Sequence, residues 1–120
     1  MNKDRFKFRA WNKETKTMHY KAEQTYDCLD GIPLIYKSSF GDVLADENYI
    51  VEQCTGLKDK NGKLIYEGDI VSCLISRPRK GVVEFQRNAF CLNENGSYSE
   101  DIVFSEKCFE VIGNVHEKAE

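Results

Sequence analysis

Two carboxylates that flank a glycine, in Glu67-Gly68-Asp69, are the side chains with the clearest catalytic potential. Carboxylates this close in sequence could act as a general acid–base pair or as ligands of a metal ion. The same residues also fit a structural corner, because glycine permits an unusual backbone angle and aspartate accepts hydrogen bonds from nearby backbone N–H groups. No histidine and no further carboxylate motif lies close to them in the sequence. We therefore favour the corner over a catalytic or metal site.

Three positive charges gather in the segment Arg77-Pro78-Arg79-Lys80, which a proline stiffens. A basic loop of this kind on a small barrel could contact the phosphates of a nucleic acid. It could also be a solvated hairpin tip that keeps the chain soluble and discourages pairing between sheet edges. Because the whole chain has a net charge of −3, we favour the solvated tip.

Trp11 follows an alternating strand and lies on the face opposite Phe6 and Phe8. It could be an exposed platform on which a nucleic-acid base stacks. A tryptophan in this position more often closes the end of a core or lies in a subunit contact, and we favour that interpretation.

Other signatures of catalysis are missing from the sequence. His19 and His116 are the only histidines, and neither belongs to a group with metal-ligand spacing. The chain contains no nucleophile elbow, phosphate-binding loop or dinucleotide fingerprint. The sequence therefore predicts no catalytic, cofactor-binding or metal-binding residue, and we do not expect an enzyme.

The size of the chain predicts one domain that spans residues 1–120. No run of apolar residues approaches the roughly 18 that a membrane span requires. The N-terminus has no apolar signal core, because Lys7 and Arg9 interrupt it. We expect a cytoplasmic protein without membrane contact.

The cysteines lie too far apart in the sequence for a zinc knuckle or a thioredoxin-type redox motif, both of which need closely spaced pairs. Their number is odd, and several fall within apolar strand-like runs. We therefore expect reduced thiols that behave as small hydrophobic side chains. The five are Cys28, Cys54, Cys73, Cys91 and Cys108.

Charge is distributed unevenly along the chain. Residues 3–16 carry six basic and two acidic side chains, whereas residues 94–120 carry seven acidic and two basic ones. The two ends could attract each other within the fold or between protomers, although two solvated faces are the simpler interpretation.

Alternating polarity indicates strands in the first part of the chain. Phe6, Phe8 and Ala10 share one face of a strand while Lys7 and Arg9 point the other way. A polar turn follows at residues 12–16, and residues 17–20 complete an N-terminal hairpin. Residues 21–47 are expected to be irregular, with a strand at residues 34–36 and a helical turn at residues 42–47.

A hairpin signal follows the strand expected at residues 49–54. In Asp59-Lys60-Asn61-Gly62-Lys63 two registers are available. A two-residue loop would place Lys60 opposite Lys63, a like-charge pair. A three-residue loop pairs Asp59 with Lys63 and gives Gly62 the left-handed backbone that a glycine bulge needs, so we prefer it.

The remainder of the chain reads as a β-meander with frequent turns. Strands are expected at residues 69–75, 82–86, 89–92, 101–104 and 108–112. Several have apolar residues on both faces, which is typical of strands in a small barrel or at an interface. The predicted fold class is mainly β, with α+β as the alternative, and the expected architecture is a small antiparallel barrel with an N-terminal hairpin.

Three stretches of the sequence resemble the YopX family of phage and prophage proteins. They are Phe8-Arg9-Ala10-Trp11, the segment from Thr55 to Val71, and Phe109 to Asn114. The middle stretch contains Gly56, Asp59, Asn61, Gly62, Gly68 and Asp69. The resemblance implies an SH3-like barrel in a protein of a bacterial host cell, and it implies no known reaction. This chain departs from the family pattern at Cys54, where an aromatic residue is expected.

These observations lead to a first hypothesis and an alternative. The first is a non-enzymatic phage or prophage accessory protein that forms homo-oligomers and contacts an unidentified phage or host protein. The alternative is a barrel that binds nucleic acid through Arg77, Arg79, Lys80 and Trp11.

Overall fold

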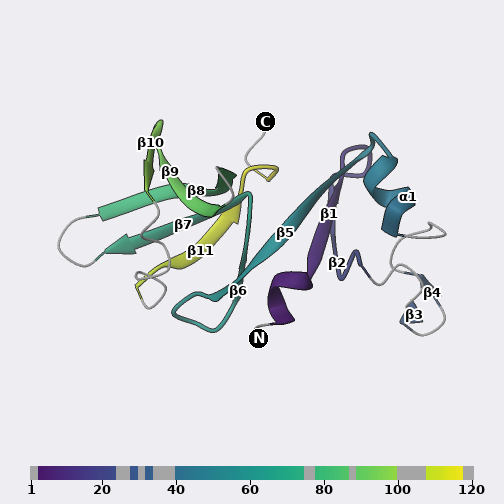
Figure 1. Cartoon of the computed structure of the whole chain (residues 1–120), viewed down its shortest axis with the longest axis horizontal. Helices are drawn as coiled ribbons and strands as arrows, with labels where there is room; N and C mark the ends of the chain where they lie inside the picture. Colours follow the sequence, from purple (N-terminus) through teal and green to yellow (C-terminus); the bar gives the residue numbers. More distant parts are fainter. Residues whose placement is uncertain are drawn as a thin grey trace.

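The computed structural model describes residues 3–23, 28–29, 32–33, 40–74, 78–86, 89–99 and 108–117 of the chain. Most of these residues belong to two larger antiparallel sheets, and a short helix lies at one end (Figure 1). The predicted fold class, mainly β with antiparallel strands, is confirmed. None of the described helices has the length and apolar character that crossing a membrane requires.

The N-terminal sheet has the strand order β2-β1-β5-β6. Its elements are the 3-10 helix η1 (Lys3–Phe6), β1 (Phe8–Asn12), β2 (Thr17–Tyr20), β5 (Tyr49–Lys58) and β6 (Leu64–Tyr66). β1 and β2 form the expected N-terminal hairpin. Helix α1 (Phe40–Ala45) packs against β5, and a small core of Ala10, Ala22 and Val43 fills the space on this side.

The C-terminal sheet has the order β10-β9-β8-β7-β11 and curls into a half-barrel (Figure 1). Its strands are β7 (Asp69–Leu74), β8 (Pro78–Gln86), β9 (Ala89–Glu94), β10 (Ser97–Ser99) and β11 (Glu110–Asn114). The concave side holds the main core, to which β6 contributes one residue. That core consists of Ile65, Val71, Cys73, Val83, Leu92 and Phe109.

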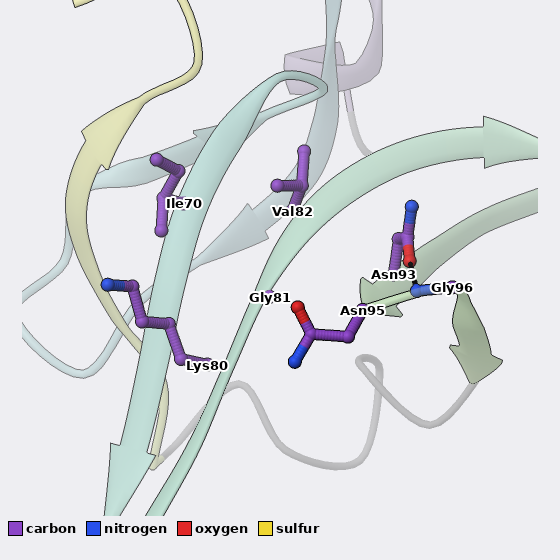
Figure 2. A pocket seen from close by; sticks show the side chains of 7 residues that line it. All are labelled: Ile70, Lys80, Gly81, Val82, Asn93, Asn95 and Gly96. Atoms are coloured by element: carbon purple, nitrogen blue, oxygen red, sulfur yellow. Dashed lines mark hydrogen bonds between the residues drawn. The ribbon is translucent and has the colours of Figure 1, made fainter. Parts of the chain in front are cut away.

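Alternation along the strands places a second set of side chains on the outer face of the C-terminal sheet. Ile70 pairs with Val82, and Val82 pairs with Asn93, so these three residues form a row across β7, β8 and β9 (Figure 2). Because successive residues of a strand point to opposite faces, this row lies on the side away from the main core.

The predicted irregular segment, residues 21–47, contains two short strands and the helix. β3 (Cys28–Leu29) pairs with β4 (Ile32–Pro33) as a separate ribbon. The helix begins at Phe40, before the predicted helical turn. The strands expected at residues 34–36 and 101–104 lie outside the described residues.

The hairpin between β5 and β6 has the three-residue loop that the sequence favours. Asp59 N–H donates to Lys63 O over 2.8 Å, and Gly62 has a φ of 85°. The Asp59 carboxylate accepts hydrogen bonds from the N–H groups of Asn61 and Lys63, both over 2.9 Å, and from that of Val111 over 3.0 Å. The carboxylate therefore closes the loop and also ties it to β11.

The same hydrogen bonds set the acidity of Asp59. Burial alone would raise its pKa, but the N–H groups of Val111, Lys63 and Asn61 outweigh burial and hold the pKa below the ordinary value of 3.8. A carboxyl whose native pKa is lowered stabilises the fold above its unfolded pKa, and that contribution disappears as the pH falls through the native pKa.

We expect Asp59→Asn to lower the free energy of unfolding by about 1–3 kcal/mol at pH 7, because the amide retains only one acceptor oxygen. The difference from the wild type should begin to narrow as the pH falls through 3.8, and it should be lost below the native pKa of Asp59, where both proteins carry a neutral group. Urea unfolding at several pH values measures this, with Glu14→Gln in the exposed β1–β2 turn as the control. A difference in unfolding free energy that does not change with pH would contradict the stabilising role of the ionised Asp59 carboxylate.

Two of the cysteines differ from the prediction of reduced thiols. Cys73 and Cys108 form a disulfide, with Cα atoms 5.3 Å apart and a sequence separation of 35. The pairing of β7 with β11 brings them together, and spacing along the sequence cannot show such a contact. Cys54 and Cys91 remain buried thiols, as expected.

Closing a loop of this length is expected to stabilise the fold by about 3–4 kcal/mol, mainly by restricting the unfolded chain. The oxidised protein should therefore unfold at a higher urea concentration than the same protein in dithiothreitol. A Cys73→Ser/Cys108→Ser variant should show no effect of the reductant. Peptide mapping without reduction should recover the Cys73–Cys108 linkage, and its absence in air-oxidised protein would contradict the pairing.

Candidate functional site

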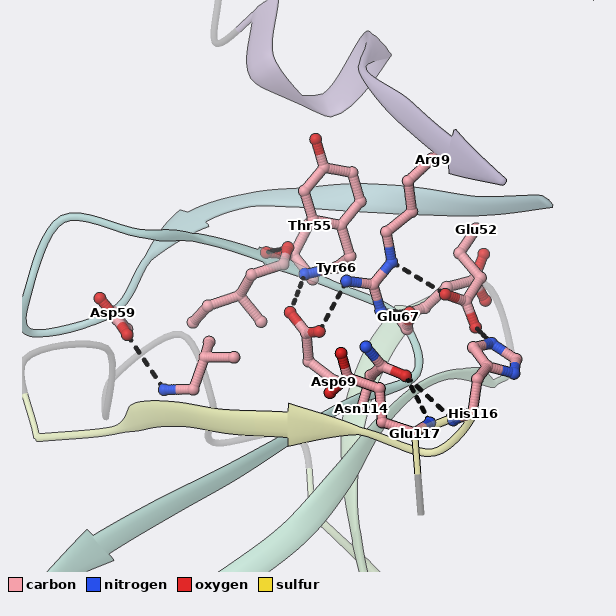
Figure 3. Close-up of polar contacts among 12 residues, drawn as sticks. Arg9, Glu52, Thr55, Asp59, Tyr66, Glu67, Asp69, Asn114, His116 and Glu117 are labelled. Atoms are coloured by element: carbon pink, nitrogen blue, oxygen red, sulfur yellow. Dashed lines mark hydrogen bonds and ion pairs between the residues drawn. The ribbon is translucent and has the colours of Figure 1, made fainter. Parts of the chain in front are cut away.

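The most concentrated group of charged side chains lies between the two sheets, where Arg9 is 1% exposed (Figure 3). Arg9 is the second residue of β1 and points away from the core under α1, because Phe8 and Ala10 occupy that side. The sequence predicted this orientation but did not show that the second face of β1 is covered as well.

The Arg9 guanidinium contacts carboxylates from both sheets. Its Nε donates to Glu52 Oε1 on β5 over 2.9 Å, and its Nη1 lies 2.8 Å from Asp69 Oδ1 at the start of β7. Its Nη2 donates to the Glu67 carbonyl oxygen over 3.1 Å. The guanidinium carbon also lies 4.9 Å from the ring centre of Tyr66. The planar fork of arginine suits such simultaneous contacts, which lysine could not make.

The Glu67-Gly68-Asp69 segment is the corner that leads from β6 into β7. Gly68 has a φ of 87°, a conformation that glycine adopts without strain. Its N–H donates to Val83 O over 2.7 Å and its carbonyl accepts from Val115 N–H over 2.9 Å. Asp69 Oδ2 accepts from Tyr66 N–H over 2.8 Å. The predicted corner role of these residues therefore matches their contacts.

The turn that follows β11, at residues 114–117, covers a third side of this charged group. His116 Nε2 lies 2.8 Å from Glu52 Oε2, and the imidazole stacks on the Trp11 indole with ring centres 5.1 Å apart. The Asn114 side-chain oxygen accepts hydrogen bonds from the N–H groups of His116 and Glu117 and so fixes the turn. Arg9, Glu52, Asp69 and His116 together are named the ion cluster below.

Burial and charge pairing together set the electrostatics of the ion cluster and of the neighbouring Glu67. Burial would lower the pKa of Arg9, but the carboxylates of Asp69 and Glu52 outweigh it and raise the pKa, so the guanidinium stays charged. Burial raises the pKa of Asp69, because Arg9 and the Tyr66 N–H offset only part of the desolvation. It likewise raises the pKa of Glu67, although Gln53 N–H donates to that carboxylate over 2.9 Å.

The ion cluster is built to hold two sheets together. Every buried side-chain nitrogen and oxygen in the described part of the chain has a hydrogen-bond partner, so no acid or base here is left uncommitted. The described residues contain no group of three or more histidine, cysteine or carboxylate side chains with metal-site geometry. These contacts favour a structural role for Asp69 over the acid–base alternative.

The described residues of the predicted nucleic-acid site come from both sheets, and Arg79 and Lys80 point to opposite faces of β8. Arg79 Nη2 lies 2.8 Å from Glu94 Oε1, and its guanidinium carbon lies 5.6 Å from the ring centre of Phe109. Trp11 is half-buried against His116 rather than exposed. Lys80 is exposed on the outer face of the C-terminal sheet, and Arg77 lies outside the described residues. The other predicted motif residues, Gly56, Asp59, Asn61 and Gly62, line the β5–β6 hairpin.

Sequence reasoning missed three members of the ion cluster. Glu52 was hidden in a strand, His116 in a polar tail, and Arg9 in an alternating pattern that is typical of a solvated face. The available signal was the choice of arginine at position 9, since arginine is the residue best suited to buried ion pairs.

The comparisons with known proteins agree with this architecture. The family model described as YopX protein matches residues 7–120, and this chain therefore belongs to the YopX family. No curated protein matches the chain.

Two solved structures are similar to this chain in fold. The crystal structure of protein EF1440 from Enterococcus faecalis has a TM-score of 0.64 and 24% sequence identity, and the match covers 95% of each chain. The structure of protein yopX from Bacillus subtilis has a TM-score of 0.59 and 20% identity, with 97% of each chain covered.

The ion cluster should be essential for stability. Arg9→Met would leave the carboxylates of Glu52 and Asp69 buried without their cation, which costs about 3–5 kcal/mol of unfolding free energy at pH 7. The loss should shrink as the pH is lowered, because the carboxyls become neutral. Chemical unfolding measures both effects, and Arg5→Met, at an exposed position of η1, is the matched control. Equal unfolding free energies of Arg9→Met and Arg5→Met would exclude the proposed role of Arg9 as the partner of the buried carboxylates.

Proposed function

We propose that this protein is a non-enzymatic accessory protein that acts through protein–protein contacts, and that its first partner is a second copy of itself. The absence of an enzymatic role is supported by the commitment of Asp69 and Glu52 to Arg9, which leaves the most promising carboxylates buried and paired. We place the contact on the exposed surface of the N-terminal sheet.

One observation carries the proposal of self-association. Trp11 pairs with Met18 on β2 and with Ile50 on β5, so three large apolar side chains form a row across three strands. Ile50 is 37% exposed, and the other two are half-buried. This Trp11 row lies on the same face as the ion cluster, beside the stacked His116. Aromatic residues and methionine are enriched at the centres of protein interfaces.

The Trp11 row has features that favour tight binding. The indole is already held by the imidazole of His116, so a partner would immobilise few additional rotamers. Polar residues border the row, which is the usual arrangement of an interface rim. Lys13 and Lys16 in the β1–β2 turn are exposed, as is Glu117 next to His116.

Charge complementarity supports a second copy as the occupant. Residues 3–16 have a balance of six basic and two acidic side chains, and residues 94–120 have seven acidic and two basic ones. A two-fold contact through the Trp11 row would bring the basic turn of one copy towards Glu117 of the other. Opposite charges placed in this way increase the rate and specificity of association.

Membership of the YopX family supports the wider setting of the proposal. We infer a phage or prophage protein that works in the cytoplasm of a bacterial host cell, where an unidentified phage or host protein is its further partner. The SH3-like barrel that the family resemblance implies belongs to the same inference.

Nucleic-acid binding through the basic loop is the second candidate. Of its described residues, Arg79 is paired with Glu94 and Trp11 is stacked on His116, which leaves Lys80 as the exposed charge. We rank this candidate below self-association, because tight binding along a nucleic-acid backbone depends on neutralising several phosphates at once, which takes several accessible cations on one surface.

Light scattering after size-exclusion chromatography tests the proposal. Wild-type protein at micromolar concentration should elute as a dimer or larger oligomer, and Ile50→Glu should raise the dissociation constant at least tenfold, about 1.4 kcal/mol. Leu44→Glu is the matched control, because Leu44 is 58% exposed on α1 and lies outside the row. A wild-type protein that remains monomeric at every concentration would refute self-association.

A further inference from the structure

A hollow of about 460 Å³ opens on the outer face of the C-terminal sheet, and its lining includes no member of the ion cluster or the Trp11 row (Figure 2). Ligand sites typically enclose roughly 300–1,000 Å³, so the hollow is large enough for a small organic molecule. Neither the family nor the proposed self-association assigns a role to this face.

The base of the hollow combines apolar side chains with an oriented amide. Ile70 and Val82 are cross-strand neighbours, and Asn93 continues their row on β9. Asn93 Nδ2 donates to Glu84 Oε2 over 2.9 Å, and Asn93 Oδ1 accepts from Gly96 N–H over 2.7 Å. The amide is therefore fixed before any ligand arrives, which lowers the entropic cost of binding.

A cation and a second amide border the hollow. Lys80 is exposed on β8 and makes no ion pair with any described residue, so its ammonium group is available to an anion. Asn95 is exposed in the β9–β10 turn, where its φ of 56° holds it in the left-handed region. Figure 2 shows the side chains of Lys80 and Asn95 together with those of Ile70 and Val82 around the hollow.

Two carboxylates on the same face as Lys80 have partners within the fold. Glu84 accepts from Asn93 and from Gln86, and Glu110 lies near Lys60, with 3.6 Å between the charged atoms. The Lys60 ammonium offsets part of the charge of Glu110, whereas the amides of Asn93 and Gln86 are neutral and leave Glu84 charged.

An exposed aromatic side chain lies next to the hollow, beside the lining residue Asn93, without being part of the lining itself. Tyr98 on β10 pairs with Asn93 and therefore lies on the same face of the sheet, where it is 55% exposed. An exposed aromatic ring beside an amide and a cation is a combination that recognises nucleotides, because bases stack on aromatic rings and carry polar edges.

We propose that this face binds a nucleotide unit, with the phosphate at Lys80, the polar edge of the base at Asn95, and the ring system against Tyr98. Free mononucleotides and single-stranded nucleic acid both present this unit. The site differs from the predicted basic loop, since it uses Lys80 without Arg79 and lies on the open face of the sheet.

Amide chemical shifts in a 15N-labelled sample test the proposal. The four ribonucleoside monophosphates, inorganic phosphate, and the oligonucleotides dT10 and rU10 should be titrated separately at low salt. At least one nucleotide or oligonucleotide should shift the amides of Lys80, Asn93, Asn95 and Gly96, and Lys80→Glu should weaken that binding at least tenfold. Lys58→Glu, at an exposed site of β5 on the other sheet, is the matched control and should leave the affinity unchanged.

Each outcome has a definite meaning. Binding of an oligonucleotide without binding of monophosphates at 10 mM, a concentration typical of roughly millimolar affinity, identifies a single strand as the source of the unit, and the reverse result identifies a free nucleotide. Equal shifts with inorganic phosphate alone, no shift with any compound, or an unchanged affinity of Lys80→Glu would each overturn the proposal. None of these results depends on the oligomeric state, so the proposal stands or fails separately from self-association.

Discussion

The Arg9 guanidinium is buried between the two sheets, and its carboxylate partners come from both of them. Removing a charge from water costs several kcal/mol, and this cost is offset only when good geometry and additional hydrogen bonds are present. The two sheets can therefore dock only where Glu52 and Asp69 both reach the guanidinium. Loss of one partner of such a pair is strongly destabilising, because it leaves a buried charge uncompensated.

Several other features follow from that requirement. Gly68 has a left-handed backbone because the chain must turn sharply to deliver Asp69 to Arg9, and a Cβ atom at this position would collide with the Glu52 carboxylate. His116 occupies the remaining oxygen of Glu52 and in doing so covers one face of Trp11. The ion cluster therefore determines which face of the Trp11 indole stays available to a partner.

The same constraint separates structural residues from candidate functional ones. Carboxylates that look reactive in sequence are consumed in joining the sheets, whereas exposed groups with few internal partners remain on two other surfaces. One is the apolar Trp11 row on the N-terminal sheet. The other is the polar hollow beside Lys80 on the curled sheet. These two exposed surfaces are therefore the candidates for function, whereas the charged interior holds the scaffold together.

Local features of the fold could be predicted from the sequence, because they depend on neighbouring residues. The three-residue loop at Lys60 to Gly62, the corner at Gly68 and the alternation of β1 follow from turn chemistry and from the two-residue period of a strand. The β-rich class and the N-terminal hairpin follow for the same reason.

Only the tertiary structure decided which faces are covered. Alternation places Arg9 opposite Phe8, but it cannot show that a second sheet packs on the arginine side. The contacts of Arg9 with Asp69, of His116 with Glu52, and of Cys73 with Cys108 all join residues far apart in the chain. Their pairing depends on the docking of one sheet against the other and on the register of β7 with β11, which no local pattern in the sequence encodes.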